Sequence, residues 1–143
     1  MSGAISTGAV SSVEKRMLQA CVVLGGVVPV GAGLWSVLYG PSGLGGGAVG
    51  VSLDSHFRYL SGLLLAIGLG FWSTVPGIEG KTARFRLLTA LVVVGGLGRA
   101  FGLLAVGAPS RGMLAALAME LGVTPLLCLW QARVSVGAKQ DDR

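Results

Sequence analysis

The chain has 143 residues, of which 52% are hydrophobic and 12% charged, and its mean hydropathy is +0.77. A soluble domain of this length cannot bury so much apolar surface, and each of its 25 glycines would cost a soluble helix about 1 kcal/mol. The net charge of +5 does not indicate a nucleic-acid partner, because the basic residues flank apolar stretches and form no single basic face. We therefore expect an all-α integral membrane protein.

The N-terminal part of the chain combines a polar segment with a first apolar span. Residues 1–16 are rich in Ser, Gly and Ala and end in one acid and two bases, which predicts a disordered tail. Residues 17–39 carry no charge and are long enough, at about 1.5 Å per residue, to cross a hydrocarbon core of about 30 Å. The i, i+4, i+8 row of Gly25, Pro29 and Gly33 predicts a helix-packing face and a kink near the proline.

Three more apolar stretches predict spans over residues 53–75, 85–106 and 113–131, and a polar tail follows over 133–143. With the first span they make a transmembrane four-helix bundle over residues 17–132. An even number of spans places both termini on one side of the membrane.

The basic residues in the short flanks predict which side that is. Cytoplasmic flanks carry an excess of Lys and Arg, and here the side of the termini holds all of them except Arg111. We therefore expect a multi-pass protein of the bacterial inner membrane with cytoplasmic N- and C-termini. The residues on that side are Lys15, Arg16, Lys81, Arg84, Arg86, Arg133, Lys139 and Arg143.

Charged side chains enter three of the predicted spans at a similar depth. Arg58, Arg99 and Glu120 each lie five to seven residues from the outer end of their span, or roughly 8 to 10 Å. One such charge near the middle of a bilayer costs about 2.5 to 3.5 kcal/mol, so we expect all three to pair in one charged cluster. Asp54 stands four residues before Arg58 and is expected to reinforce it.

This charged cluster is the candidate site, either as a ligand-binding site or as a structural ion-pair network. His56, Tyr59 and Thr124 are secondary candidates, and His56, like Asp54, is expected close to the outer interface. No His or Cys stands at metal-ligand spacing near His56, so we expect no metal and no cofactor. Small residues share helical rows with the charges and predict close helix packing there. These rows hold Gly62, Ala66 and Gly70 after Arg58, and Gly95, Gly98 and Gly102 around Arg99.

Four sequence elements carry a resemblance to a known family. They are Arg16-x-Leu18-Gln19, Asp54-Ser55-His56-Phe57-Arg58-Tyr59-Leu60-Ser61-Gly62, Gly95-Gly96-Leu97-Gly98-Arg99 and Glu120-x-x-x-Thr124-Pro125. Together, over residues 14–133, the chain resembles a family of small four-span bacterial membrane proteins catalogued as a domain of unknown function (DUF4345). The resemblance implies the four-span fold and carries over no activity, substrate or cofactor.

Two classes of function remain open from the sequence. We favour a non-enzymatic protein, because no catalytic or cofactor motif is recognisable. Such a protein would bind a lipid or small amphipathic ligand at the charged cluster, or act as an accessory subunit. Its partners would be membrane lipids, further copies of the chain or a larger membrane complex. The alternative is a small proton-coupled carrier or membrane-embedded enzyme in which Glu120 titrates and His56 relays protons with Asp54. On a helical wheel His56 lies about 160° from Arg58, which disfavours one site containing both.

Overall fold

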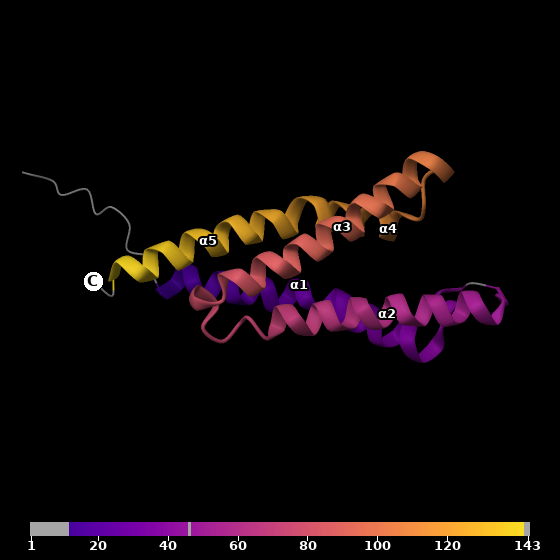
Figure 1. Ribbon diagram of the computed structural model, residues 1–143, viewed down its shortest axis with the longest axis horizontal. Coiled ribbons are helices and arrows are strands. Elements are labelled where there is room, and N and C mark those ends of the chain that lie inside the picture. The colour runs from indigo at the N-terminus through magenta and orange to yellow at the C-terminus, as the bar shows by residue number, and fades with distance from the viewer. Residues whose placement is uncertain (1–11, 46, 142–143) are drawn as a thin grey trace, which may run out of the picture. The chain divides into compact units, whose positions relative to one another are not determined.

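The computed structural model describes residues 12–45 and 47–141, and within them all regular structure is helical (Figure 1). This confirms the all-α fold class predicted from the sequence. The elements in chain order are α1 (Ser12–Tyr39), a 3₁₀ turn (Pro41–Leu44), α2 (Val51–Trp72), a 3₁₀ turn (Ile78–Gly80), α3 (Thr82–Val106), α4 (Arg111–Ala118), a π-helical turn (Met119–Val123) and α5 (Thr124–Asp141). The last three form one continuous helical run.

Three helices of the described chain are long and apolar enough to cross a membrane. They are α1, α3 and the run from Arg111 to Gln140. Missing from this group is α2, because Asp54, His56 and Arg58 in its first two turns lower its average hydropathy. Its 22 residues would still extend about 33 Å. A fourth span through α2 stays a prediction.

The predicted polar tails are helical where the structure describes them. Residues 1–11 and 142–143 lie outside the described part, but α1 begins at Ser12 and α5 continues to Asp141. The helices therefore extend past the predicted span ends at residues 17 and 132, while the boundaries of the membrane-spanning domain stay a prediction. At the start of α1 the reason is packing: Glu14 accepts a hydrogen bond from Trp130 Nε1 at 3.0 Å, and Lys15 contacts Glu79 at 2.7 Å.

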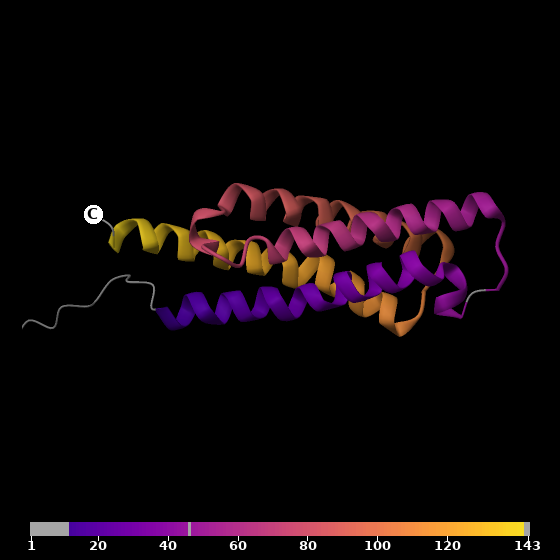
Figure 2. The same ribbon diagram turned by 90° about the horizontal axis from the view of Figure 1, so that it is seen from below.

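The described chain divides into two compact units, of which the first is Cys21–Val75. In it α2 packs on the adjoining part of α1, and glycine permits the close approach (Figure 2). A Cβ atom added at Gly33 would lie 2.7 Å from the backbone nitrogen of Leu65, and one at Gly68 would lie 2.7 Å from Val30 Cγ2. Neither position has room for a side chain without a shift of its neighbour.

The predicted packing row on α1 is partly correct. Gly33 lies at the interface, and a Cβ atom at Gly68 would lie 3.3 Å from Pro29 Cγ. At Gly25 an added Cβ atom would meet nothing within 4 Å among the described residues, whereas one at Gly26 would clash with the indole of Trp72. In the first part of α1 the packed glycine is therefore Gly26, one residue after the predicted Gly25.

In the described chain the second unit comprises residues 12–20 and 76–141. Here α3 packs along α4 and α5. The core of this unit gathers the start of α1, the 3₁₀ turn before α3 and the later part of α5. Its buried hydrophobic side chains are Leu18, Ile78, Phe85, Leu88 and Val134.

Candidate functional site

Arg58 and Asp54 form an ion pair on one face of α2. Arg58 Nε donates to Asp54 Oδ2 at 2.7 Å, and Nη2 donates to Oδ1 at 3.3 Å. The four-residue spacing brings the two side chains together on one helical face, as expected from the sequence. Both charges are thus compensated within a single helix.

Arg58 also binds the C-terminal end of α1. Its Nη1 donates to the carbonyl oxygens of Val37 at 2.6 Å and Leu38 at 3.1 Å. The last carbonyls of a helix lack intrahelical donors and carry partial negative charge, so a guanidinium stabilises them. Gly40, with φ +63°, ends α1 beside this contact, where a Cβ atom would lie 2.6 Å from Arg58 Nη2. Arg58 therefore fastens α2 to the end of α1.

Arg99 of α3 and Glu120 of the π-helical turn form a second ion pair, which joins two helical segments. Arg99 Nε donates to Glu120 Oε2 at 3.0 Å, and Nη2 donates to Oε1 at 3.1 Å. The Arg99 side chain is 33% exposed and that of Glu120 is 19% exposed. A two-point pair of this kind fixes orientation as well as charge.

The third contact of Arg99 is chemically weaker. Nη1 donates to the thioether sulfur of Met113 at 3.0 Å, and thioether sulfur is a poor hydrogen-bond acceptor. Among the described residues no other acceptor meets this guanidinium. Arg58 and Arg99 therefore bind their carboxylates in the same way but differ at Nη1, where Arg58 has two carbonyls and Arg99 has a sulfur.

The π-helical turn and a glycine place Glu120 against α3. Pro125 has no N–H to give to the carbonyl four residues earlier, and Thr124 Oγ1 donates to the Met119 carbonyl at 3.0 Å. On α3 an added Cβ atom at Gly96 would lie 2.7 Å from Leu121 Cδ2 and 3.0 Å from Glu120 Cβ. The close approach of the two helices therefore depends on Gly96.

Four glycines of the small-residue rows predicted beside the charges have no close neighbour in the described chain. An added Cβ atom at Gly62, Gly95, Gly98 or Gly102 would meet nothing within 4 Å among the described residues. On α2 and α3 the closely packed glycines are Gly68 and Gly96 instead. A residue next to a packed one is turned by about 100° on a helix, so the pattern located the right segment of α3 but the wrong face.

The residues of the predicted cluster form two ion pairs, one in each unit. Arg58 with Asp54 lies in the unit Cys21–Val75, and Arg99 with Glu120 lies in the other unit. Whether the two pairs join into one cluster stays a prediction.

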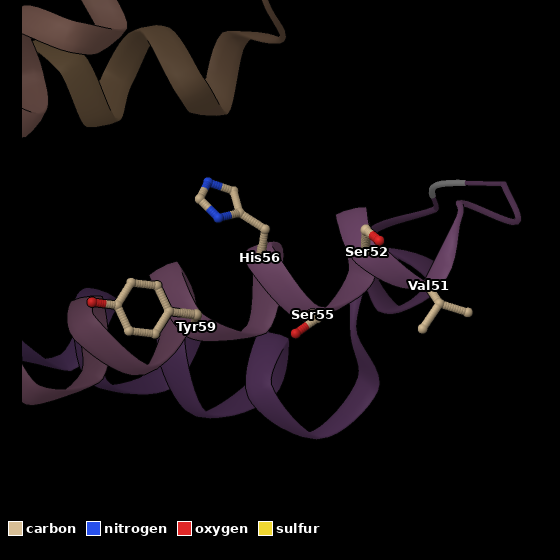
Figure 3. Close-up of a pocket in the computed structure, with 5 residues that line it drawn as sticks. All are labelled: Val51, Ser52, Ser55, His56 and Tyr59. Carbon is tan, nitrogen blue, oxygen red and sulfur yellow. The ribbon is translucent and has the colours of Figure 1, made fainter.

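His56 and Tyr59 lie on another face of α2. With Val51, Ser52 and Ser55 they line an open hollow at the start of this helix (Figure 3). All five lining residues come from the first three turns of α2, so the hollow is a polar helix face and encloses nothing by itself. The structure places His56 there, while Arg58 contacts α1.

A polar network in the second unit was not predicted from the sequence. Lys15 Nζ lies 2.7 Å from Glu79 Oε1, and this hydrogen bond is the main cause that lowers the pKa of the Glu79 carboxyl. Fully buried Gln131 donates through Nε2 to the Ile78 carbonyl at 2.8 Å and to Thr82 Oγ1 at 3.0 Å. These contacts join residues 49 to 64 positions apart, so no local sequence pattern predicts them.

Comparison with known proteins identifies one family. The family model described as Domain of unknown function (DUF4345) matches residues 17–131, a stretch that contains Arg58, Arg99 and Glu120. This confirms the family resemblance expected from the sequence. No curated protein and no solved structure gives a match.

Proposed function

The chain belongs to the DUF4345 family, and from that premise we propose that it is a non-enzymatic integral membrane protein that binds a lipid or small amphipathic ligand beside Arg99. In this proposal α2 is the fourth span, the helices form a bundle in the bacterial inner membrane, and both termini are cytoplasmic. The three long apolar helices and the basic residues at their flanks support this topology.

The observation that carries the proposal is the difference between Arg58 and Arg99. Four hydrogen bonds from Arg58 go to carboxylate or carbonyl oxygens, whereas only two from Arg99 go to oxygen. In a bilayer no water meets the remaining donors, and an unsatisfied polar group there is costly. A ligand with an oxygen acceptor would accept a hydrogen bond from Arg99 Nη1, as the α1 carbonyls accept from Arg58 Nη1.

The surroundings of Arg99 suit the apolar part of such a ligand. On α3 the side chain of Leu103 is half-buried and that of Val106 is 91% exposed. They follow Arg99 by four and seven residues and so lie on its face of the helix. An acyl chain can lie along these two side chains while its polar head reaches the guanidinium.

A binding role fits Glu120 better than a proton-transfer role. Both of its carboxylate oxygens accept hydrogen bonds from Arg99, so both are occupied. A proton carrier has to gain and lose its proton within the working cycle. Glu120 would first have to leave Arg99.

Native mass spectrometry of the protein extracted gently from its own membrane tests the proposal. We expect a retained lipid or metabolite in the wild type, its loss in Arg99→Gln, and its retention in Arg86→Gln. The matched control Arg86→Gln removes an arginine from the other end of α3. A protein that carries no adduct would contradict the proposal. A stoichiometric partner protein in place of a small molecule would favour the accessory-subunit function instead.

A further inference from the structure

We infer that the ligand beside Arg99 carries an anionic head, a phosphate or carboxylate, which binds the guanidinium edge that Glu120 leaves open. This inference rests on the proposed function and names the chemical class of its ligand. The head would take the place of Met113 as the acceptor for Nη1.

The geometry of the guanidinium carries the inference. Glu120 occupies the edge formed by Nε and Nη2, through contacts of 3.0 and 3.1 Å. Guanidinium has five N–H donors, so the second hydrogen of Nη2 and those of Nη1 remain, with only the Met113 sulfur as partner. These donors form a second fork, which matches the two oxygens of a carboxylate or phosphate.

The charge around the fork also favours an anion. Arg99 and Glu120 compensate each other, and Arg111 stands two residues before Met113, in the first turn of α4. The side chain of Arg111 has no ion pair among the described residues, so this end of the helix pair carries one excess positive charge. A neutral carbonyl could accept from Arg99 but would leave that charge uncompensated, whereas hydrogen bonds to an ionised acceptor are roughly twice as strong.

Two substitutions distinguish this fork from a purely structural ion pair. Glu120→Gln removes the negative charge that neutralises Arg99 and repels a second anion, so an anionic ligand should bind the open fork more tightly. Met113→Glu supplies a carboxylate from the chain itself, so it should block the fork while Arg99 and Glu120 both remain. Met113→Leu keeps the bulk without the charge and is the matched control.

The test is a lipid titration of the purified full-length protein in detergent, followed by native mass spectrometry. Dioleoylphosphatidylglycerol is the anionic probe and dioleoylphosphatidylcholine the zwitterionic one. We expect the wild type and Met113→Leu to prefer the anionic lipid by about tenfold or more, as one charge-assisted contact would give. Glu120→Gln should strengthen that preference, and Arg99→Gln and Met113→Glu should abolish it. The thermal unfolding transition of each variant verifies that it is folded.

The experiment distinguishes failure of the anionic-head inference from failure of the proposed function. If the wild type binds both lipids equally and Arg99→Gln loses this binding, the inference of an anionic head is wrong and the proposed function stands. Binding of neither lipid, and of no native adduct, would overturn both. Inorganic phosphate that displaces the anionic lipid at equal concentration would assign the fork to a free anion and overturn the amphiphile. A weaker preference in Glu120→Gln, with the protein folded, would also contradict the inference.

Discussion

At the scale of single residues, Arg58 and Arg99 have similar carboxylate partners but differ in their other contacts. Each binds a carboxylate through Nε and Nη2, at 2.7 to 3.3 Å for Arg58 and 3.0 to 3.1 Å for Arg99. What separates them is the partner of Nη1, which is backbone oxygen for Arg58 and thioether sulfur for Arg99. Oxygen acceptors from the fold itself satisfy Arg58, and under the proposed function the corresponding donors of Arg99 bind a ligand.

Arg58→Gln should therefore destabilise the unit that contains α1 and α2 without changing ligand retention. The substitution leaves Asp54 without its counter-charge and removes donors from the carbonyls of Val37 and Leu38. We expect a lower midpoint of thermal unfolding in detergent and faster hydrogen exchange at the end of α1. An unfolding midpoint equal to that of Arg86→Gln would contradict the structural role of Arg58.

At the scale of helices, hydropathy predicted the elements, but not their ends or their packed faces. Apolar runs with charged flanks located all four helical segments, because length and composition decide helix formation in a bilayer. The ends at Ser12 and Asp141 depend on contacts such as that between Glu14 and Trp130, which lie 116 residues apart. A run that is apolar all round also gives no signal for which glycine faces a neighbour, so Gly96 was missed in favour of Gly95.

For the candidate site too, the sequence predicted which residues are involved but not most of their contacts. The positions of Asp54, Arg58, Arg99 and Glu120 stood out because charge is rare in apolar spans. The i, i+4 spacing predicted the pairing of Asp54 with Arg58. The carbonyl contacts of Arg58 and the sulfur contact of Arg99 depend on side-chain geometry between helices, which sequence spacing does not encode.

A pair of glycine substitutions on α1 tests the helix packing. Gly33→Ala places a Cβ atom 2.7 Å from the backbone of Leu65 and should cost about 1 to 3 kcal/mol of unfolding free energy. Gly31→Ala, on the same helix, meets nothing within 4 Å among the described residues and should be neutral or slightly stabilising. Chemical unfolding in mixed detergent measures both. Equal effects would show that α1 and α2 do not pack through Gly33.

At the scale of the whole molecule, the proposed topology depends on α2 crossing the membrane. Topology reporters, placed in the segments after α1, α2 and α3, test this directly. We expect an alkaline phosphatase fusion to be active in residues 41–50 and 107–110 and inactive in 76–81, because basic flanks remain in the cytoplasm. Equal phosphatase activity in 41–50 and 76–81 would mean that α2 does not cross.

The polar network around Glu79 makes stability depend on pH. The Lys15 hydrogen bond lowers the pKa of Glu79 in the folded protein, relative to about 4.3 in an unfolded chain. The contact therefore stabilises the fold above pH 4.3, and this stabilisation is lost as the pH falls through the lower, folded-state pKa. Its size at neutral pH is about 1 kcal/mol or less, as for other partly exposed ion pairs.

Thermal unfolding of the wild type and Glu79→Gln between pH 7 and pH 3 measures this dependence. The stability difference between the two proteins should be present at pH 7 and should shrink below about pH 5, as the wild-type carboxyl becomes protonated. Lys15→Met should show the same reduced pH dependence as Glu79→Gln. A difference that is constant over the whole range would contradict the role of this contact.

The central claim is that Arg99 binds a ligand and Arg58 does not, and ¹⁵N NMR of the arginine side chains tests it most directly. The protein is labelled at arginine, and the guanidinium signals are assigned by Arg58→Gln and Arg99→Gln. On addition of dioleoylphosphatidylglycerol we expect the Arg99 Nη signals to shift progressively, while those of Arg58 remain in place. A shift of Arg58 with Arg99 unchanged, or no shift at either arginine at lipid saturation, would contradict the claim.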